Sequence, residues 1–266
     1  MKKLDQYAEK QAELCVKNGV IPAELYKEFG VKRGLRDLDG QGVVTGITNI
    51  SQIISFREVN GELIPCDGEL LYRGYDIRDL VEGAKNNRDV YEEGAHLLLF
   101  SKLPNREELK EMKSVIAENM VLPRNFTRDV IMKAPDTDIM SSMTKSILTL
   151  ASYDKKKNDL SIENVLAQSI RLIAQFPMLA IYGYHAYNHF VNDESMFIHR
   201  PDTRLSIAEN FLRMLRPDNK FTELEAKVLD VALLLHMEHG GGNNSTFTTR
   251  VVTSAGTDTY SAIAAA

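Results

Sequence analysis

The pattern of hydrophobic residues changes twice along this chain, near residues 30 and 76. After residue 76 apolar residues recur every three or four positions, as Ile139, Met143 and Ile147 do, which is the spacing of amphipathic helices. Before it lie short runs rich in β-branched and aromatic residues, such as Val43–Val44 and Ile53–Phe56. We therefore expect three regions: a helical N-terminus over 1–30, short strands over 31–75 and a helical core over 76–266.

Turn and cap residues divide these regions into elements. Asn60–Gly61 predicts a hairpin turn, and Asp67–Gly68 predicts a second turn. Pro177 is expected to kink or split the long apolar stretch that begins after Ser161. Candidate capping boxes at helix starts are Asp89 with Glu92, Asn105 with Glu108, and Thr222 with Glu225. The predicted fold is all-α, mainly helical, with a small N-terminal β-hairpin region.

Composition narrows the classes of function. The chain has 266 residues, a net charge of −5 and an isoelectric point near 5.8, so nothing indicates a nucleic-acid partner. Its two cysteines, Cys15 and Cys66, form neither a disulfide framework nor a metal-binding spacing. Because the N-terminus lacks an apolar signal core and no apolar run approaches about 20 residues, we expect no membrane association. A reduced, cytoplasmic setting fits these features.

Unusual residue choices concentrate between His236 and Phe247. An apolar helix is expected to run into His236, Glu238 and His239 and to break on three glycines. Asn243 is among the residues that can cap the helix that follows. A histidine beside that helix start lies near its positive dipole end, which favours a neutral imidazole able to donate to a substrate carbonyl. From spacing alone, His239 is either such a donor or a histidine that caps and packs at a helix end.

Two histidine pairs have spacings that could hold a metal ion. His236 and His239 are three residues apart, and His185 and His189 are four apart, so each pair could share a helix face. No cysteine lies near them and neither pair forms a His-Glu-x-x-His motif, so we predict no metal site. The run Gly240–Gly242 follows no predicted strand and precedes no Lys-Ser/Thr pair, which argues against a phosphate-binding loop. No cofactor is expected.

Four segments, in the same order along the chain, resemble one family. The stretch from His236 to Phe247 resembles the histidine motif of citrate synthases, roughly His-x-Asp-His-Glu followed by a Ser/Thr-rich helix start. Three further segments are similar to other elements of that family: DGELLYRGYDI at 67–77, LSIAENFLRML at 205–215 and YSAIAAA at 260–266. Together they identify the chain as similar to the N-terminal, large-domain part of a bacterial-type citrate synthase.

The resemblance implies a mainly helical large domain that pairs with a smaller domain, and a homodimer. It implies condensation of acetyl-CoA with oxaloacetate, followed by hydrolysis of the thioester, with acetyl-CoA as a substrate and no separate cofactor. His239 takes the place of the family's first catalytic histidine, which hydrogen-bonds the acetyl carbonyl oxygen as the enol or enolate forms. The same resemblance assigns His236 and Asn243 to substrate binding.

Three departures from the family pattern matter. Gly240 stands where family members have an acid, and Glu209 stands where mitochondrial-type members have a histidine that contacts oxaloacetate. The chain also ends before the family's second catalytic histidine, its aspartate base and its substrate-binding arginines. Without the base the enolate cannot form efficiently. We therefore expect this 266-residue chain to be an inactive N-terminal fragment, without the small domain, that associates with itself through exposed apolar helix faces.

Other functions are open at this point. A 2-methylcitrate synthase, which uses propionyl-CoA, would carry the same motifs, because the acyl pocket cannot be recognised in the sequence. A non-catalytic helical protein could keep the fold as a dimerisation or regulatory module. A small metal-binding helical protein could use the histidine pairs.

Overall fold

The computed structural model describes residues 11, 18, 21–30, 48–83 and 89–266. The chain divides into two compact units, Met1–Thr45 and Gly46–Ala266. In the first unit, helix α2 (Ala23–Glu28) begins after Pro22, as a proline at a helix start should. Most of the helix expected before α2, and the strand expected at 43–44, lie outside the described residues.

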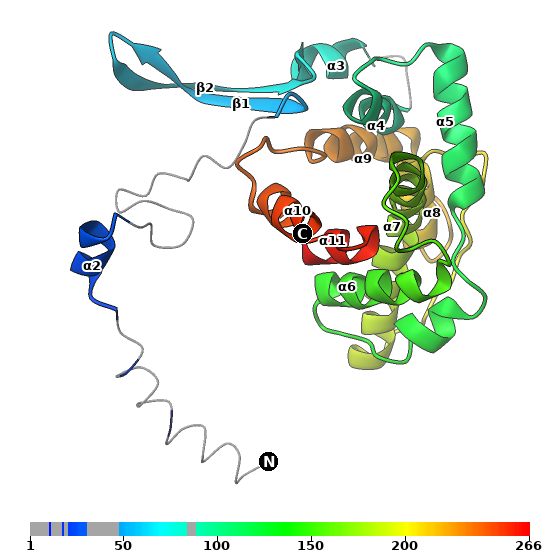
Figure 1. Cartoon of the computed structure of the whole chain (residues 1–266). Coiled ribbons are helices and arrows are strands. Elements are labelled where there is room, and N and C mark those ends of the chain that lie inside the picture. Colours follow the sequence, from blue (N-terminus) through cyan, green and yellow to red (C-terminus); the bar gives the residue numbers. More distant parts are fainter. Residues whose placement is uncertain (1–10, 12–17, 19–20, 31–47, 84–88) are drawn as a thin grey trace. The chain divides into compact units, whose positions relative to one another are not determined.

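The strand region of the second unit forms a small antiparallel sheet. Strands β1 (Ser51–Val59), β2 (Glu62–Tyr72) and β3 (Tyr75–Asp76) pair in the order β1-β2-β3. Asn60 and Gly61 connect β1 to β2 with φ values of 55° and 83°. Positive φ at both positions is what a tight two-residue hairpin turn requires. The predicted hairpin is therefore confirmed, and it extends from the helical part of its unit as a long arm (Figure 1).

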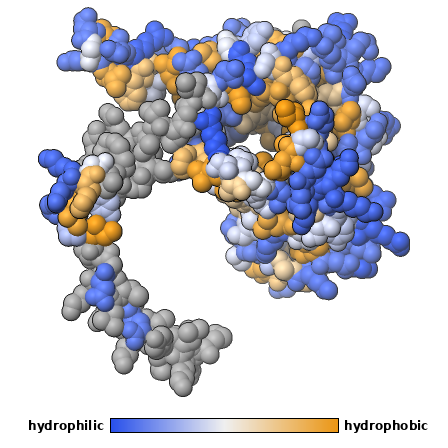
Figure 2. Space-filling model, in the orientation of Figure 1, coloured by the Kyte–Doolittle hydropathy of each residue, from blue (hydrophilic) through white to orange (hydrophobic). Residues whose placement is uncertain are grey.

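The second predicted turn, at Asp67–Gly68, is wrong. Strand β2 runs through both residues, but the pairing register shifts here. Ile54 pairs with Glu69 and Phe56 with Pro65, so residues 66–68 of β2 lie opposite Ser55 alone. A register shift of this kind is a β-bulge, which bends a strand without ending it. Gly68 therefore lies within an irregularity of the ladder and does not reverse the chain. Most side chains of the hairpin beyond this point are exposed. The face that Figure 2 shows carries apolar and polar residues together.

Helices make up the rest of the described chain, which confirms the mainly helical fold (Figure 1). In order they are α3 (Ile77–Gly83), α4 (Val90–Phe100), α5 (Arg106–Asn119), the π-helix η1 (Thr127–Ile131), α6 (Ile139–Leu150), the 3₁₀ turn η2 (Ala151–Tyr153), α7 (Ile162–Val191), α8 (Ile207–Leu215), α9 (Glu223–Leu235), α10 (Asn244–Ser254) and α11 (Thr259–Ala265). The main hydrophobic core forms around α7, which packs against α5, α6, α8 and α11.

Helix α7 differs from two expectations. It continues through Pro177 as one 30-residue helix, so the predicted split is wrong. It also has an 18-residue window of mean hydropathy 1.3, and by length and composition alone it could cross a membrane, contrary to our expectation that no run is long enough. Half of that window is buried within the protein, and the buried side chains include Gln168 and Gln175. These are the properties of a core helix. Packing against its neighbouring helices outweighs the loss of the one backbone hydrogen bond that Pro177, which has no N–H, cannot donate.

Two of the three predicted capping boxes form at the starts of their helices. Asn105 with Glu108 and Thr222 with Glu225 each form both reciprocal hydrogen bonds, which confirms these two boxes. The third prediction, Asp89 with Glu92, is wrong in its mechanism although α4 does begin there, because Asp89 makes no side-chain cap.

Instead, a carboxylate from another helix caps α4. Asp230 of α9 accepts the N–H groups of Val90 at 2.9 Å and Tyr91 at 3.0 Å. Glu92 in turn caps α8, because its Oε1 accepts the N–H of Ile207 at 2.9 Å. Two buried carboxylates therefore join α4 to α9 and to α8, and α9 is the helix that leads into the histidine motif.

Candidate active site

The histidine motif forms the connection between α9 and α10. Helix α9 ends at Leu235, and His236 follows as its C-cap with Nδ1 2.7 Å from the carbonyl oxygen of Ala232. Because the helix stops there, His236 and His239 do not share a helix face. Asn243 caps α10, with its Oδ1 accepting from Ser245 N at 2.7 Å and more weakly from Thr246 N at 3.4 Å. His239 therefore lies between a helix end and a helix start, as the sequence predicts.

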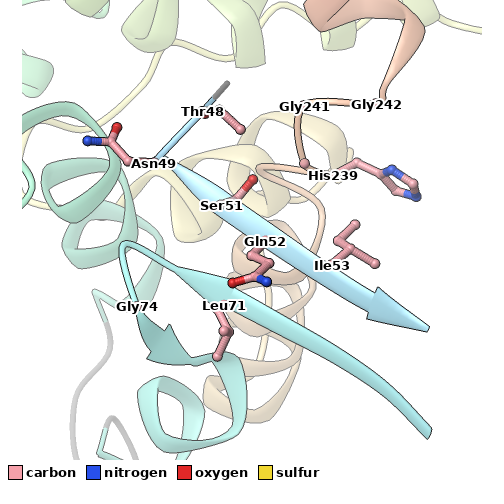
Figure 3. A pocket seen from close by; sticks show the side chains of 11 residues that line it. Thr48, Asn49, Ser51, Gln52, Ile53, Leu71, Gly74, His239, Gly241 and Gly242 are labelled. Carbon is pink, nitrogen blue, oxygen red and sulfur yellow. The ribbon is translucent and has the colours of Figure 1, made fainter. Parts of the chain in front are cut away.

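A cavity of about 680 Å³ lies between this connection and the base of the hairpin. In Figure 3 the imidazole of His239 projects from the connection on the side of β1 that carries Ile53. The described residues of the lining include no carboxylate and no Lys or Arg; they are Thr48, Asn49, Ser51, Gln52, Ile53, Leu71, Gly74 and residues 239–242. The cavity thus offers an exposed imidazole among neutral hydrogen-bonding groups, which suits a polar substrate oxygen.

The glycines bring the connection close to β1. Gly240 is buried and has a φ of +81°, a left-handed conformation that other residues rarely adopt. A Cβ on Gly240 would lie 3.6 Å from Ile53, and a Cβ on Gly241 would lie 3.0 Å from Thr48 Cγ2. Gly240 stands where the resemblance places an acid. A glycine there suits both the left-handed backbone conformation and the close contact with strand β1.

Glu238 fixes the backbone of His239. One carboxylate oxygen, Oε1, accepts the N–H of Gly240 at 2.8 Å and the N–H of His239 at 3.1 Å. The same oxygen accepts the hydroxyl of Ser51 in β1 at 3.0 Å. Hydrogen bonds to an ionised carboxylate are stronger than neutral ones. The residue before the histidine therefore determines how the turn is held.

Tyr72 supports the same turn from β2. Its buried hydroxyl donates to the carbonyl of Leu234 at 2.9 Å and accepts the N–H of Glu238 at 3.2 Å. Burial raises the pKa of Tyr72 above its usual value, which keeps the hydroxyl protonated and able to donate. Sequence reasoning missed the contacts of Ser51 and Tyr72 with Glu238, because each is more than 160 residues from Glu238 and the family-like segment at 67–77, which contains Tyr72, does not indicate that partner.

The other predicted site residues are placed as follows. His236 is exposed, and neither His236 nor Asn243 lines the cavity, so their assignment to substrate binding stays a prediction. The rings of His185 and His189 meet the carbonyl oxygens of Met214 and Glu194 at 3.1 and 2.8 Å. Within the described ranges, no three His, Cys, Asp or Glu side chains lie close enough to hold a metal ion together.

The mainly helical fold, with His239 on a glycine-rich turn between two helices, is the arrangement that the resemblance to citrate synthases implies. Residues 37–266 match the family model described as citrate synthase, C-terminal domain. The chain belongs to the citrate synthase family, whose enzymes are acyltransferases.

Individual relatives agree with this family. The chain is 31% identical over 252 residues to a citrate synthase of Corynebacterium glutamicum, a match that covers 93% of this chain and 52% of the relative. It is 30% identical over 198 residues to a citrate/2-methylcitrate synthase of Bacillus subtilis, covering 74% of this chain and 50% of the relative. The chain therefore spans about half the length of the curated relatives it matches.

Solved structures show the same fold. The citrate synthase of Pyrobaculum aerophilum superposes with a TM-score of 0.71 at 25% identity and covers 88% of this chain and 56% of that protein. The citrate synthase of Thermoplasma acidophilum gives a TM-score of 0.69 at 22% identity, with coverage of 88% and 54%, which shows the fold alone.

Proposed function

We propose that this chain supplies the first catalytic histidine, His239, of an enzyme that condenses acetyl-CoA with oxaloacetate to citrate and CoA. The observation that carries the proposal is the place of His239, on a glycine-rich turn that lines a cavity of neutral hydrogen-bonding groups. The relatives named citrate synthase support the reaction, and the Thermoplasma acidophilum structure was solved with carboxymethyl coenzyme A and oxaloacetate.

In the proposed reaction, a neutral His239 donates a ring N–H to the acetyl carbonyl oxygen. A base takes a proton from the acetyl methyl group, and the developing enolate charge is stabilised by that hydrogen bond. The enolate carbon then forms a bond to the keto carbon of oxaloacetate, whose C=O π bond breaks as its oxygen takes up a proton to become the hydroxyl of citrate. Water then hydrolyses the thioester to release CoA. His236 and Asn243 are proposed to contact substrate from the two ends of the same connection.

Several wider features belong to the same proposal. The described helices are proposed to form most of the large domain of a two-domain, cytoplasmic homodimer. A purified chain that sediments only as a monomer would count against self-association.

The assay compares the 266-residue chain with the longest protein that its gene encodes. We expect the 266-residue chain to form no citrate from acetyl-CoA and oxaloacetate, because the family's aspartate base is not recognisable within it. In the longer protein, His239→Ala should lower kcat by about 100-fold or more, as loss of a donor to a developing oxyanion does. An unchanged rate in that variant would favour a non-catalytic role.

The second candidate is 2-methylcitrate synthesis from propionyl-CoA. It is supported by relatives named citrate/2-methylcitrate synthase in Bacillus subtilis and 2-methylcitrate synthase in Shewanella oneidensis. The two candidates differ in the acyl group alone, so kcat/KM for acetyl-CoA and propionyl-CoA on the same active protein separates them. A higher value for propionyl-CoA would replace the first proposal with the second.

A further inference from the structure

One cross-strand pair at the base of the hairpin holds the residue that precedes His239. Ser51 of β1 and Tyr72 of β2 face each other in the antiparallel ladder. The Ser51 hydroxyl binds the side chain of Glu238, and the Tyr72 hydroxyl binds its backbone N–H. Both residues are buried, with exposed fractions of 7% for Ser51 and 0% for Tyr72.

We propose that Glu238 is a positioning residue for His239, oriented by Ser51 and Tyr72, so that the hairpin base places the backbone from which the catalytic imidazole projects. The proposal rests on the function proposed above for His239. Glu238 is assigned no contact with substrate; it acts through the backbone that carries His239.

The hydrogen bonds leave the turn little freedom. Glu238 Oε1 accepts the N–H groups of the two residues that follow it, and those N–H groups belong to His239 and to the left-handed Gly240. The peptide groups on both sides of the His239 Cα are therefore restrained by a single oxygen atom. Since the imidazole is attached at that Cα, the restrained backbone fixes the direction of the Cα–Cβ bond from which the ring projects.

The same contacts couple the hairpin to the turn. Ser51 is the first residue of β1, and Ile53, two residues further on the same strand, lies where a Cβ on Gly240 would meet it at 3.6 Å. Tyr72 is the last residue of β2 and also binds the end of α9 through Leu234. A displacement of the strand ends therefore moves the hydroxyl groups of Ser51 and Tyr72 away from Glu238. The hairpin base thus influences the backbone position of His239.

The test measures amide hydrogen exchange and the imidazole NMR signals of His239 in the 266-residue chain. In Glu238→Ala, the His239 and Gly240 amides should exchange about tenfold faster or more, because both lose a charge-assisted acceptor. The His239 ring signals should shift at the same time. Glu238→Gln keeps an acceptor oxygen of the same reach and should restore part of the protection, and Ser51→Ala should have a smaller effect in the same direction.

Asn105→Ala is the matched control, because it removes a capping side chain from α5 and leaves the hairpin base intact. It should leave exchange at His239 and Gly240 unchanged even where it lowers global stability. Wild-type exchange and ring signals in Glu238→Ala would overturn the proposal.

The rate of the longest encoded protein adds a second readout. If Glu238 positions His239, Glu238→Ala should lower kcat by about tenfold or more with little change in the KM for oxaloacetate, and Glu238→Gln should recover part of kcat. An unchanged kcat would overturn the positioning role. A wild-type protein that condenses neither acetyl-CoA nor propionyl-CoA with oxaloacetate would instead refute the proposed function. The amide exchange measurement would still test whether Glu238 holds the backbone of His239.

Discussion

The buried carboxyl group of Glu92 leads us to predict how the free energy of unfolding depends on pH. Its side chain is 1% exposed, Oε1 caps α8 through Ile207, and Oε2 has no hydrogen-bond partner among the described residues. Burial, with the nearby charges of Asp230 and Asp89 adding to it, raises the pKa of Glu92 from 4.5 to about 7. The folded protein therefore holds a proton on Glu92 over a pH range in which the unfolded chain has lost it.

The sign and size of the effect follow by linkage. Below pH 4.5 Glu92 is protonated in both states and contributes no pH dependence. As pH rises toward 7, only the unfolded chain releases the proton, so the free energy of unfolding falls. At about 1.4 kcal/mol per pKa unit, the shift from 4.5 to about 7 corresponds to roughly 3 kcal/mol. This is opposite to the behaviour of a carboxylate in an ion pair.

Glu92→Gln removes this term and keeps an oxygen that can cap α8. Urea unfolding of the wild type and the variant between pH 4 and pH 8.5 should show the variant gaining up to about 3 kcal/mol relative to the wild type across the range. The exposed Glu111→Gln on α5 is the control and should run parallel to the wild type. Parallel profiles for Glu92→Gln and the wild type would refute the argument that burial keeps this carboxyl protonated.

Three further substitutions test local features by urea unfolding. Gly94→Ala should lower the free energy of unfolding by about 1–3 kcal/mol, although alanine favours a helix more than glycine does. The new Cβ would overlap Leu234 Cδ1 and lie 3.1 Å from Met237 Sδ. A gain in stability would show that α9 moves aside. Asn243→Ala should cost about 1 kcal/mol through loss of the α10 cap, with Asn243→Asp close to wild type, and equal losses in both would argue against capping. Gly240→Ala should cost about 1–2 kcal/mol because its φ is +81°, and a neutral effect would contradict that conformation.

Local patterns predicted the elements well where the determining contacts are local. The hairpin turn at Asn60–Gly61 and the capping box of Asn105 with Glu108 depend on residues within a few positions of each other, so the sequence contains all the information they need. The cap at Asn243 and the place of His239 beside it follow for the same reason. The family resemblance then supplied the catalytic assignment that spacing alone left open.

Distant contacts explain the failures. Asp89 and Glu92 have the spacing of a capping box, but Asp230, 140 residues from Val90, caps α4 and leaves Glu92 for α8. Likewise nothing near Ser51 or Tyr72 indicates that they hold Glu238, because that relation exists only once the hairpin base meets the α9–α10 connection. Tertiary partners decide between alternatives that each look satisfactory in sequence.

The bulge near Ile54 also has a consequence for handling the protein. Strand β1 lies at an edge of the described sheet, and its exposed tip carries Phe56 and Val59, a combination that favours strand addition and aggregation. The register shift interrupts the straight edge, and Arg57, which pairs with Glu69 across the hairpin, puts charge beside the apolar side chains. The register shift and this charged pair therefore make the edge a poorer template for pairing with a second copy in concentrated preparations.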